Sequence, residues 1–229
     1  MKKFLSILLA MLMLLSGIAF AETADNIVYV SISDDTGALV LAYVPVAVSD
    51  ADGDGALTIC DALVCAHTMY HPDGAAAFVA EDTEWGKSLY VLWGIDNGGS
   101  YGYMLNDVSP MSLLDEVKPG DHVKAYAYTD LTAWSDTYSY FAAPVAAVAV
   151  NEEVALTLSA NGYDESWNPV TYPVQGAFLV VDGEVYDDVV TDAEGKFALT
   201  FPEAGVYTVS AVSNDLTLVP PVCIVTVTE

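Results

Sequence analysis

The sequence predicts an α+β module with one helix, followed by an all-β sandwich. Three observations carry this prediction. Apolar and polar residues alternate over most of the chain, which is the pattern of half-buried strands. One stretch, 61–70, has helical spacing instead. Beyond Pro144, short apolar runs recur about every ten residues with turn residues between them, as in β-sandwiches. We therefore expect modules at 22–143 and 144–229.

Residues 1–21 read as a secretory signal peptide. Lys2 and Lys3 precede an apolar run at 4–15, and Ala19 and Ala21 form an A-x-A cleavage site. A transmembrane anchor is the alternative, but the run ends in small residues rather than at a charged stop. We therefore expect a secreted protein at the extracellular cell surface, with no membrane insertion after signal cleavage.

The composition sets limits on the partners. The 229 residues include 32 Asp and Glu but 6 Lys and Arg, so the formal net charge is −26. Nucleic acids and anionic membranes are bound through clustered Lys and Arg, and this charge argues against both as partners. Hydrophobic residues make up 54% of the chain, which is enough for a packed core and too much for a disordered acidic tail.

The first module should open with a β-hairpin. Alternating residues at 28–32 and an apolar run at 39–48 flank the turn cluster 34–37. The helix at 61–70 places Leu63, His67 and Tyr70 on one face, and Pro72-Asp73-Gly74 ends it. Further strands are predicted at 89–93, 101–105, 122–128 and 137–141.

The second module should consist of short strands alone. Asp182-Gly183 and Glu194-Gly195 predict tight hairpin turns, since glycine tolerates a positive φ. The predicted strands are 154–158, 177–181, 197–201, 207–212 and 223–227.

The loop 50–61 has the spacing of a twelve-residue calcium loop. Carboxylates fall at positions 1, 3, 5 and 12, Gly55 permits the turn at position 6, and Leu57 at position 8 anchors the loop to the core. A hard cation binds six to eight oxygens, which explains the alternate acidic residues. An Asp/Gly-rich surface turn is the alternative, but it explains only one or two Asp-Gly pairs. The predicted Ca²⁺ ligands are Asp50, Asp52, Asp54, the Ala56 carbonyl and Asp61.

The loop and the following helix, about 48–70, resemble one half-repeat of a dockerin, the module that binds cohesins in cellulosomes. The Asp at position 12 is part of this resemblance. Dockerins normally carry two such repeats, whereas this chain has one, and a strand rather than a helix enters its loop. We therefore expect a structural calcium site, with a cellulosome-type, cohesin-binding assembly piece as the alternative.

Two wider resemblances concern the modules. Trp93-Gly94-Ile95, Tyr101–Leu105 with Asn106, and the segment 118–123 resemble transcobalamin C-terminal-like modules of bacterial surface proteins. That resemblance implies a β-grasp-like fold, and cobalamin binding is a further alternative. Segments 190–197 and 205–211 resemble bacterial Ig-like repeats, which implies an Ig-like sandwich with a spacing or adhesive role.

Other chemistry is disfavoured. His67 and His71 have zinc-chelating spacing but lack a third ligand. Cys60 and Cys65 point to different helix faces, so they and Cys223 are expected to be buried free thiols. No catalytic Ser/His/Asp order or phosphate loop stands out, and an acidic pair of the glycosidase type is a coincidence until it lies in a cleft.

The sequence thus predicts a non-enzymatic, calcium-binding adhesion or ligand-binding protein whose partner is an extracellular protein or carbohydrate. Aromatic residues are dense in the first module and either fill its core or form a binding face. These residues are Trp85, Trp93, Trp134, Tyr138 and Tyr140.

Overall fold

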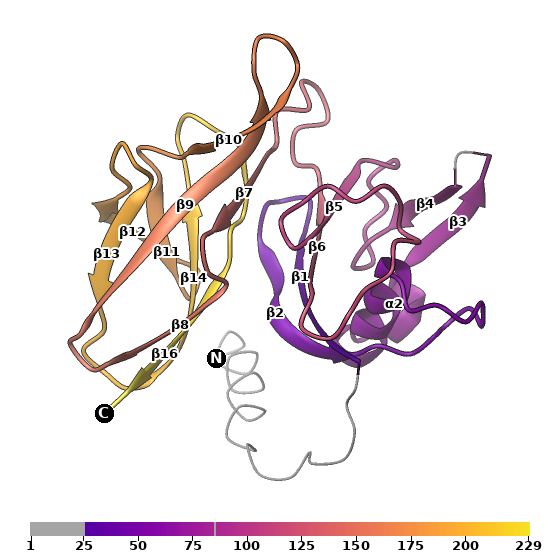
Figure 1. Cartoon of the computed structure of the whole chain (residues 1–229), viewed down its shortest axis with the longest axis horizontal. Coiled ribbons are helices and arrows are strands. Elements are labelled where there is room, and N and C mark those ends of the chain that lie inside the picture. The colour runs from indigo at the N-terminus through magenta and orange to yellow at the C-terminus, as the bar shows by residue number, and fades with distance from the viewer. Residues whose placement is uncertain (1–25, 85) are drawn as a thin grey trace.

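The computed structural model describes residues 26–84 and 86–229 (Figure 1). The predicted signal peptide, 1–21, and Trp85 lie outside the described residues. Strands predominate in the described part of the chain, which has one α-helix, so the mainly β fold predicted from the sequence is confirmed. No described helix has the length and apolar character needed to cross a bilayer.

A four-stranded mixed sheet forms the centre of the first module. Its strand order is β2-β1-β6-β5, with β1 antiparallel to β2 and parallel to β6. The predicted hairpin is therefore present. The strands are β1 (Ile27–Ser33), β2 (Leu39–Ala47), β5 (Tyr101–Leu105) and β6 (His122–Ala127). A separate hairpin, β3 (Val79–Thr83) with β4 (Gly86–Val91), follows the 3₁₀ helix η1 (Gly74–Ala77).

Helix α2 (Ile59–Tyr70) covers one face of this sheet. Thr58 caps its N-terminus, and Thr58 and Asp61 form a reciprocal capping box. The helix therefore begins two residues before the predicted 61–70. Ile59, Leu63 and Ala66 are fully buried in the core between helix and sheet. Helical spacing of apolar residues thus produced the expected packing face.

The second module has two sheets around one core. One sheet has the order β10-β9-β7-β15, with β13 also paired to β9, and the other has the order β12-β11-β14-β16-β8. Leu158, Leu179 and Val225 are fully buried between the sheets. The strands are β7 (Thr137–Phe141), β8 (Val145–Ala149), β9 (Glu153–Tyr163), β10 (Pro169–Pro173), β11 (Phe178–Val181), β12 (Glu184–Val190), β13 (Lys196–Thr200), β14 (Gly205–Val212), β15 (Leu218–Val219) and β16 (Cys223–Thr228).

Strand β7 belongs by its hydrogen bonds to the second module. It lies before the predicted boundary at 143/144, yet it pairs antiparallel with β9 and parallel with β15. The backbone therefore passes from one module to the other in the connection 128–136, between β6 and β7. Its own alternation correctly predicted a strand, but alternation does not specify which sheet a strand joins.

The two modules pack against each other through β6. All six residues of β6 are buried, because α2 covers one face of the strand and the second module covers the other. Val123 and Ala125 face the helix side, while Tyr126 joins a cluster with Tyr138 and Val219. The modules lie side by side in Figure 1.

Tyr126 also explains a glycine in the neighbouring strand. A Cβ at Gly102 would overlap Cζ of Tyr126, whose side chain is buried. Gly102→Ala is therefore expected to destabilise the protein by about 1–3 kcal/mol through overpacking, measured by urea unfolding. In the Tyr126→Ala background the same substitution should have little further effect. An equal loss in both backgrounds would contradict this explanation.

Candidate metal centre

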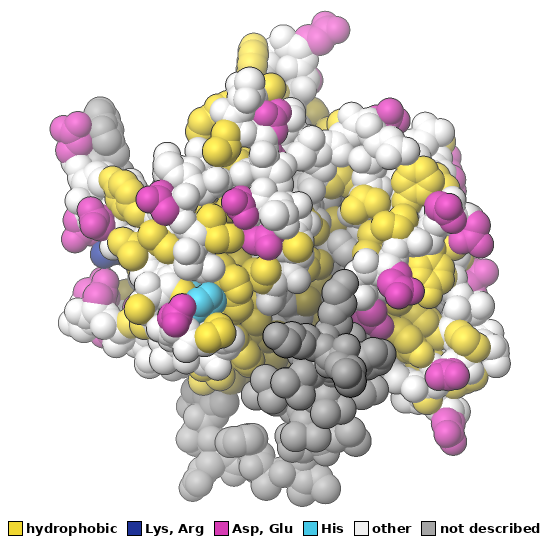
Figure 2. Space-filling model, turned by 180° about the vertical axis from the view of Figure 1, so that it is seen from behind, with side chains coloured by type: hydrophobic (Ala, Val, Ile, Leu, Met, Phe, Trp, Pro, Cys, Tyr) yellow, Lys and Arg dark blue, Asp and Glu magenta, His cyan; other side chains and the backbone are white. Residues whose placement is uncertain are grey.

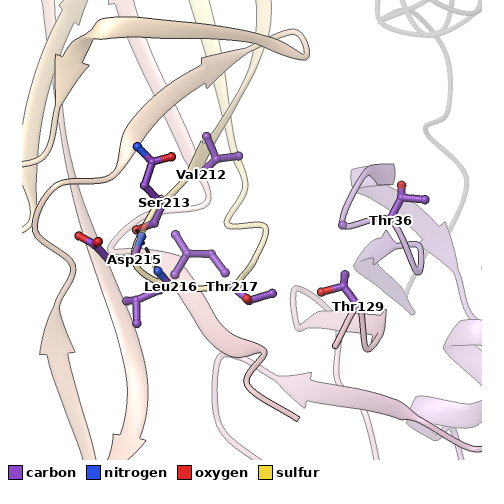
Figure 3. Close-up of a pocket in the computed structure, with 10 residues that line it drawn as sticks. Thr36, Thr129, Val212, Ser213, Asp215, Leu216 and Thr217 are labelled. Carbon is purple, nitrogen blue, oxygen red and sulfur yellow. Dashed lines mark hydrogen bonds between the residues drawn. The ribbon is translucent and has the colours of Figure 1, made fainter. Parts of the chain in front are cut away.

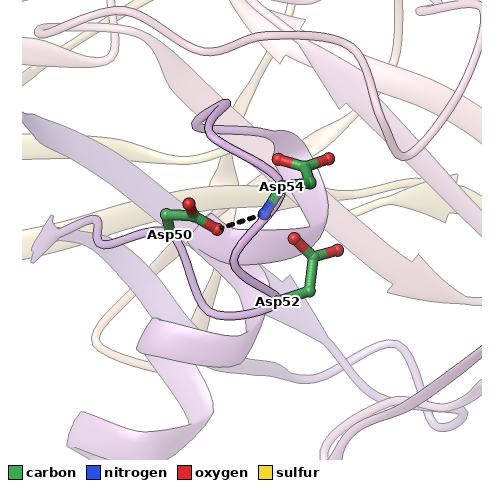
Figure 4. A group of neighbouring side chains, drawn as sticks. All are labelled: Asp50, Asp52 and Asp54. Carbon is green, nitrogen blue, oxygen red and sulfur yellow. Dashed lines mark hydrogen bonds between the residues drawn. The ribbon is translucent and has the colours of Figure 1, made fainter.

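The predicted calcium loop connects β2 to α2 and protrudes from the first module. Asp50, Asp52 and Asp54 occupy every second position at the start of the loop, and their side chains project from it (Figure 4). All three side chains are exposed, and each contributes a carboxylate oxygen to a group whose members lie within 4.8 Å of one another. The structure therefore brings together the first three predicted ligands.

Asp50 organises the backbone of this loop. Its Oδ1 accepts hydrogen bonds from the backbone N–H groups of Gly53 (2.6 Å) and Asp54 (3.2 Å), and its Oδ2 accepts from Gly55 (2.9 Å). These bonds, with that from Gly55 first, lower the pKa of the Asp50 carboxyl group below its ordinary value. Asp50 is therefore ionised throughout the neutral range.

Asp61 lies apart from this group of three. Its side chain is 2% exposed, and its Oδ2 accepts from the Thr58 backbone N–H (2.9 Å) and hydroxyl (2.7 Å). Its Oδ1 accepts from the Ala51 N–H at 2.9 Å. The residue at position 12 therefore closes the loop by bonding position 2 and caps the helix at the same time. The spacing of the acidic residues in the sequence did not reveal this helix-capping role.

The remaining loop positions behave as the spacing requires. Gly53 and Gly55 have φ values of +78° and +93°, where a side chain is strained. The Ala56 N–H donates to Asp54 Oδ1 at 2.8 Å. Leu57 packs against the first core, and its carbonyl accepts from the Val117 N–H at 2.8 Å. The loop is thereby anchored to the module.

The electrostatic setting favours a cation at this loop. Figure 2 shows acidic side chains spread over both modules, with very little lysine beside them. Within the described residues, lysine forms one ion pair with a carboxylate, Lys87 Nζ to Asp82 Oδ1 at 3.2 Å. The cluster of Asp50, Asp52 and Asp54 therefore has no lysine ion-paired to it in the described part of the chain. Its carboxylates repel one another unless a cation neutralises them.

His67 is built into the core rather than into a metal site. Its Nδ1 donates to the Leu63 carbonyl at 2.6 Å, and its Nε2 accepts from the Trp93 N–H at 2.9 Å. Both ring nitrogens are thus used. Burial lowers the pKa of His67 to about 4, so the ring is neutral at physiological pH. Trp93 lies just after β4, with φ +54°, rather than in the predicted strand 89–93.

The three cysteines are buried free thiols, as predicted. Burial raises the pKa of Cys60 to about 11 and that of Cys223 to about 12. Both thiols are therefore protonated at neutral pH and unreactive as nucleophiles.

Sequence reasoning missed Lys124, which is the most deeply buried charged side chain at the junction of the modules. It is 2% exposed, its Nζ donates to the Ser139 carbonyl at 2.9 Å, and it lies 4.7 Å from the centre of the Tyr138 ring. Burial lowers the pKa of Lys124 to about 7, with Asp107 acting in the opposite direction. The sequence signal that could have revealed this burial is a lysine that stands between two apolar residues of a predicted strand.

Further bonds join the modules around Lys124. The Tyr138 hydroxyl donates to Asp107 Oδ1 at 2.7 Å, and the Asn161 amide donates to the Asp107 carbonyl at 3.1 Å. Within the second module, Ser139 Oγ donates to the Val219 carbonyl at 2.8 Å, which ties β7 to β15 beside Lys124. Tyr138 and Tyr140, which the sequence left open as core or binding face, therefore lie in or against the interface cluster.

Comparison with protein-family models, curated proteins and solved structures finds no match to this chain.

Proposed function

We propose that this chain is a secreted, non-enzymatic, two-module binding protein of the cell surface whose first module is stabilised by calcium. The convergence of Asp50, Asp52 and Asp54 in one exposed loop is the observation that carries the proposal. All three offer carboxylate oxygens, the ligands that calcium prefers. Zinc prefers nitrogen and sulfur ligands, which these three aspartates do not supply.

The Ala56 carbonyl is the fourth protein ligand in this proposal, and water supplies the rest. Asp61 holds the loop closed through Ala51 and caps the helix. A site with so few protein ligands is weak, on the order of 10⁻⁴–10⁻³ M, as is typical of extracellular modules. The bound ion neutralises the loop and fixes the entry into α2, which is the stabilising role we assign to it.

The fold types of the two modules support a role at the cell surface. The order β2-β1-β6-β5, with β1 parallel to β6 and a helix after the first hairpin, is compatible with a β-grasp-like module. The second module has two sheets around one core, with β8 parallel to β16, and is compatible with an Ig-like sandwich. We assign the two modules to these fold types, and the pairing to adhesion or ligand binding.

Calcium is expected to raise the melting temperature. Stabilisation follows RT ln(1 + [Ca²⁺]/Kd), which is about 2.7 kcal/mol at a hundredfold excess over Kd. The measurement is calorimetric unfolding of the mature chain in excess calcium and in EGTA. Identical melting curves in the two conditions would contradict the site.

Asp52→Ala provides the sharper test. No backbone hydrogen bond to the Asp52 carboxylate is present in the described residues, in contrast to Asp50, so its removal spares the loop structure. We expect the variant to melt like the wild type in EGTA and to lose most of the calcium shift. Asp35→Ala, which removes an exposed carboxylate from another turn, should keep the full shift.

A further inference from the structure

A cleft opens between the modules, away from the calcium loop. It has a volume of about 340 Å³, within the range of small-ligand sites, and such sites favour domain interfaces. One wall is formed by Thr36, Gly37 and Thr129 of the first module. The facing wall is the segment 212–218 of the second module (Figure 3).

The walls of this cleft are held by capped turns. Asp34 Oδ1 accepts from the N–H and the hydroxyl of Thr36, at 2.9 and 2.6 Å. Thr129 donates through its N–H and hydroxyl to Asp136 Oδ1, at 2.8 and 2.9 Å. On the other wall, Ser213 Oγ accepts from the N–H groups of Asp215 and Leu216 at 3.1 and 3.3 Å. A ligand therefore meets a preorganised site and needs to order little of the protein.

The second of these walls is bonded to strand β7. The Thr137 N–H donates to the Thr217 carbonyl at 2.7 Å, and β15 pairs with β7 directly beyond it. Segment 212–218 is thus bonded to the strand that follows the connection from β6. That connection includes Thr129 of the other wall, and the interface cluster of Tyr126, Tyr138 and Val219 packs the two modules together.

The polar groups of the lining residues differ in their availability, and Figure 3 shows the Thr217 side chain pointing toward the facing wall and that of Asp215 pointing away from it. Asn214, Asp215 and Thr217 are exposed, and within the described residues their side chains make no hydrogen bond. They offer one amide, one carboxylate and one hydroxyl group, which together donate and accept. The Thr36 and Thr129 hydroxyls donate to carboxylates but keep lone pairs that accept.

The charge and apolar surface of the cleft restrict the ligand. No lysine or histidine is among the lining residues, and Asp215 adds a negative charge, so anionic ligands are disfavoured. A single carboxylate does not make a metal site. Val212, Leu216 and Leu218 supply apolar contacts beside the polar groups. Hydroxyl-rich rings with apolar C–H faces match both features.

From these observations we propose that the cleft between the modules binds a neutral oligosaccharide, with Asn214 and Thr217 as its hydrogen-bonding residues. This inference rests on the proposed ligand-binding role, for which it names the ligand class, and it is independent of the calcium loop.

The test is isothermal titration of the mature chain with four neutral probes: cellotetraose, xylotetraose, mannotetraose and maltotetraose. We expect saturable binding of at least one probe, with tetragalacturonate, which is anionic, not binding. Asn214→Ala combined with Thr217→Val should weaken binding at least tenfold and leave the melting temperature unchanged. The Thr217 carbonyl bond to Thr137 is retained in that variant. Failure of all four probes to bind, or tighter binding of tetragalacturonate, would overturn the proposal.

Trp167→Ala is the matched control. Trp167 is 81% exposed at the tip of the β9–β10 hairpin, beside Tyr163, and is an exposed aromatic side chain of the kind that stacks on sugars. We expect this variant to bind as the wild type does. Loss of binding in Trp167→Ala with retention in the cleft variant would place the sugar at the hairpin and overturn the proposal. The calcium shift in melting temperature, measured on the same samples, separates failure of this inference from failure of the calcium site.

Discussion

Lowering the pH from about 7.5 to about 5 is expected to remove about 4 kcal/mol of unfolding free energy through two buried histidines. Burial lowers the pKa of His67 to about 4 and that of His122 to about 3, from an ordinary value of 6.5. Lys124 lowers the pKa of His122 further. The unfolded chain therefore binds more protons below about pH 6.5, and stability falls as the pH falls.

Urea unfolding across this pH range measures the effect. The range ends above the region in which Asp130 titrates, since its backbone and side-chain hydrogen bonds lower its pKa to about 2. His122→Gln is the informative variant, because its amide can bond to the Ser31 hydroxyl, which lies 2.9 Å from His122 Nε2. About half of the pH dependence should disappear in this variant. A wild-type stability that is flat between these pH values would contradict the buried, neutral state of both rings.

Replacing Lys124 by Met is expected to change the alkaline side of the stability profile. The ordinary lysine pKa is 10.5, and burial lowers that of Lys124 to about 7. Between these values the unfolded chain binds more protons, so this group makes stability rise with pH. From about pH 7 to about pH 9.5 its contribution is about 3 kcal/mol, and Lys124→Met lacks it.

The quantity to measure is the difference in unfolding free energy between wild type and Lys124→Met at the two pH values. Ionisation of unfolded thiols acts in the opposite direction, because burial raises the pKa of Cys60 and Cys223, but it is common to both proteins. Lys196→Met removes an exposed lysine and should show no such pH-dependent difference. If the difference in unfolding free energy between wild type and Lys124→Met is the same at both pH values, the Lys124 amine of the wild type is not desolvated.

Local patterns predicted the strands with strong alternation and the helix. Strands 101–105 and 137–141 agree with β5 and β7 residue for residue, and α2 begins at Ile59 because Thr58, rather than a residue nearer 61, is the cap. Strands β3, β8, β10, β12 and β15 were not predicted. β12 is exposed at nearly every position, so its sequence does not alternate between buried apolar and exposed polar residues.

The candidate metal site was predictable because its ligands are close in sequence. Asp50, Asp52 and Asp54 converge through the turn geometry of a few consecutive residues. The role of Asp61 was less accessible, since its bond to Ala51 depends on how the helix meets the start of the loop. The cleft was beyond sequence reasoning, because its walls at Thr36, Thr129 and 212–218 are distant along the chain.

The amino-acid sequence by itself determines three properties of this protein: the order of acidic residues in one short loop, the strand and helix periodicities, and the large negative charge. Each of them depends on near neighbours in the chain or on composition. Tertiary structure alone decided that β7 joins the second module, that β6 is covered on both faces and that a lysine lies in the resulting interface. The physical reason is that these outcomes depend on packing between segments far apart in the chain. Alternation within one strand does not specify which distant segment that strand packs against.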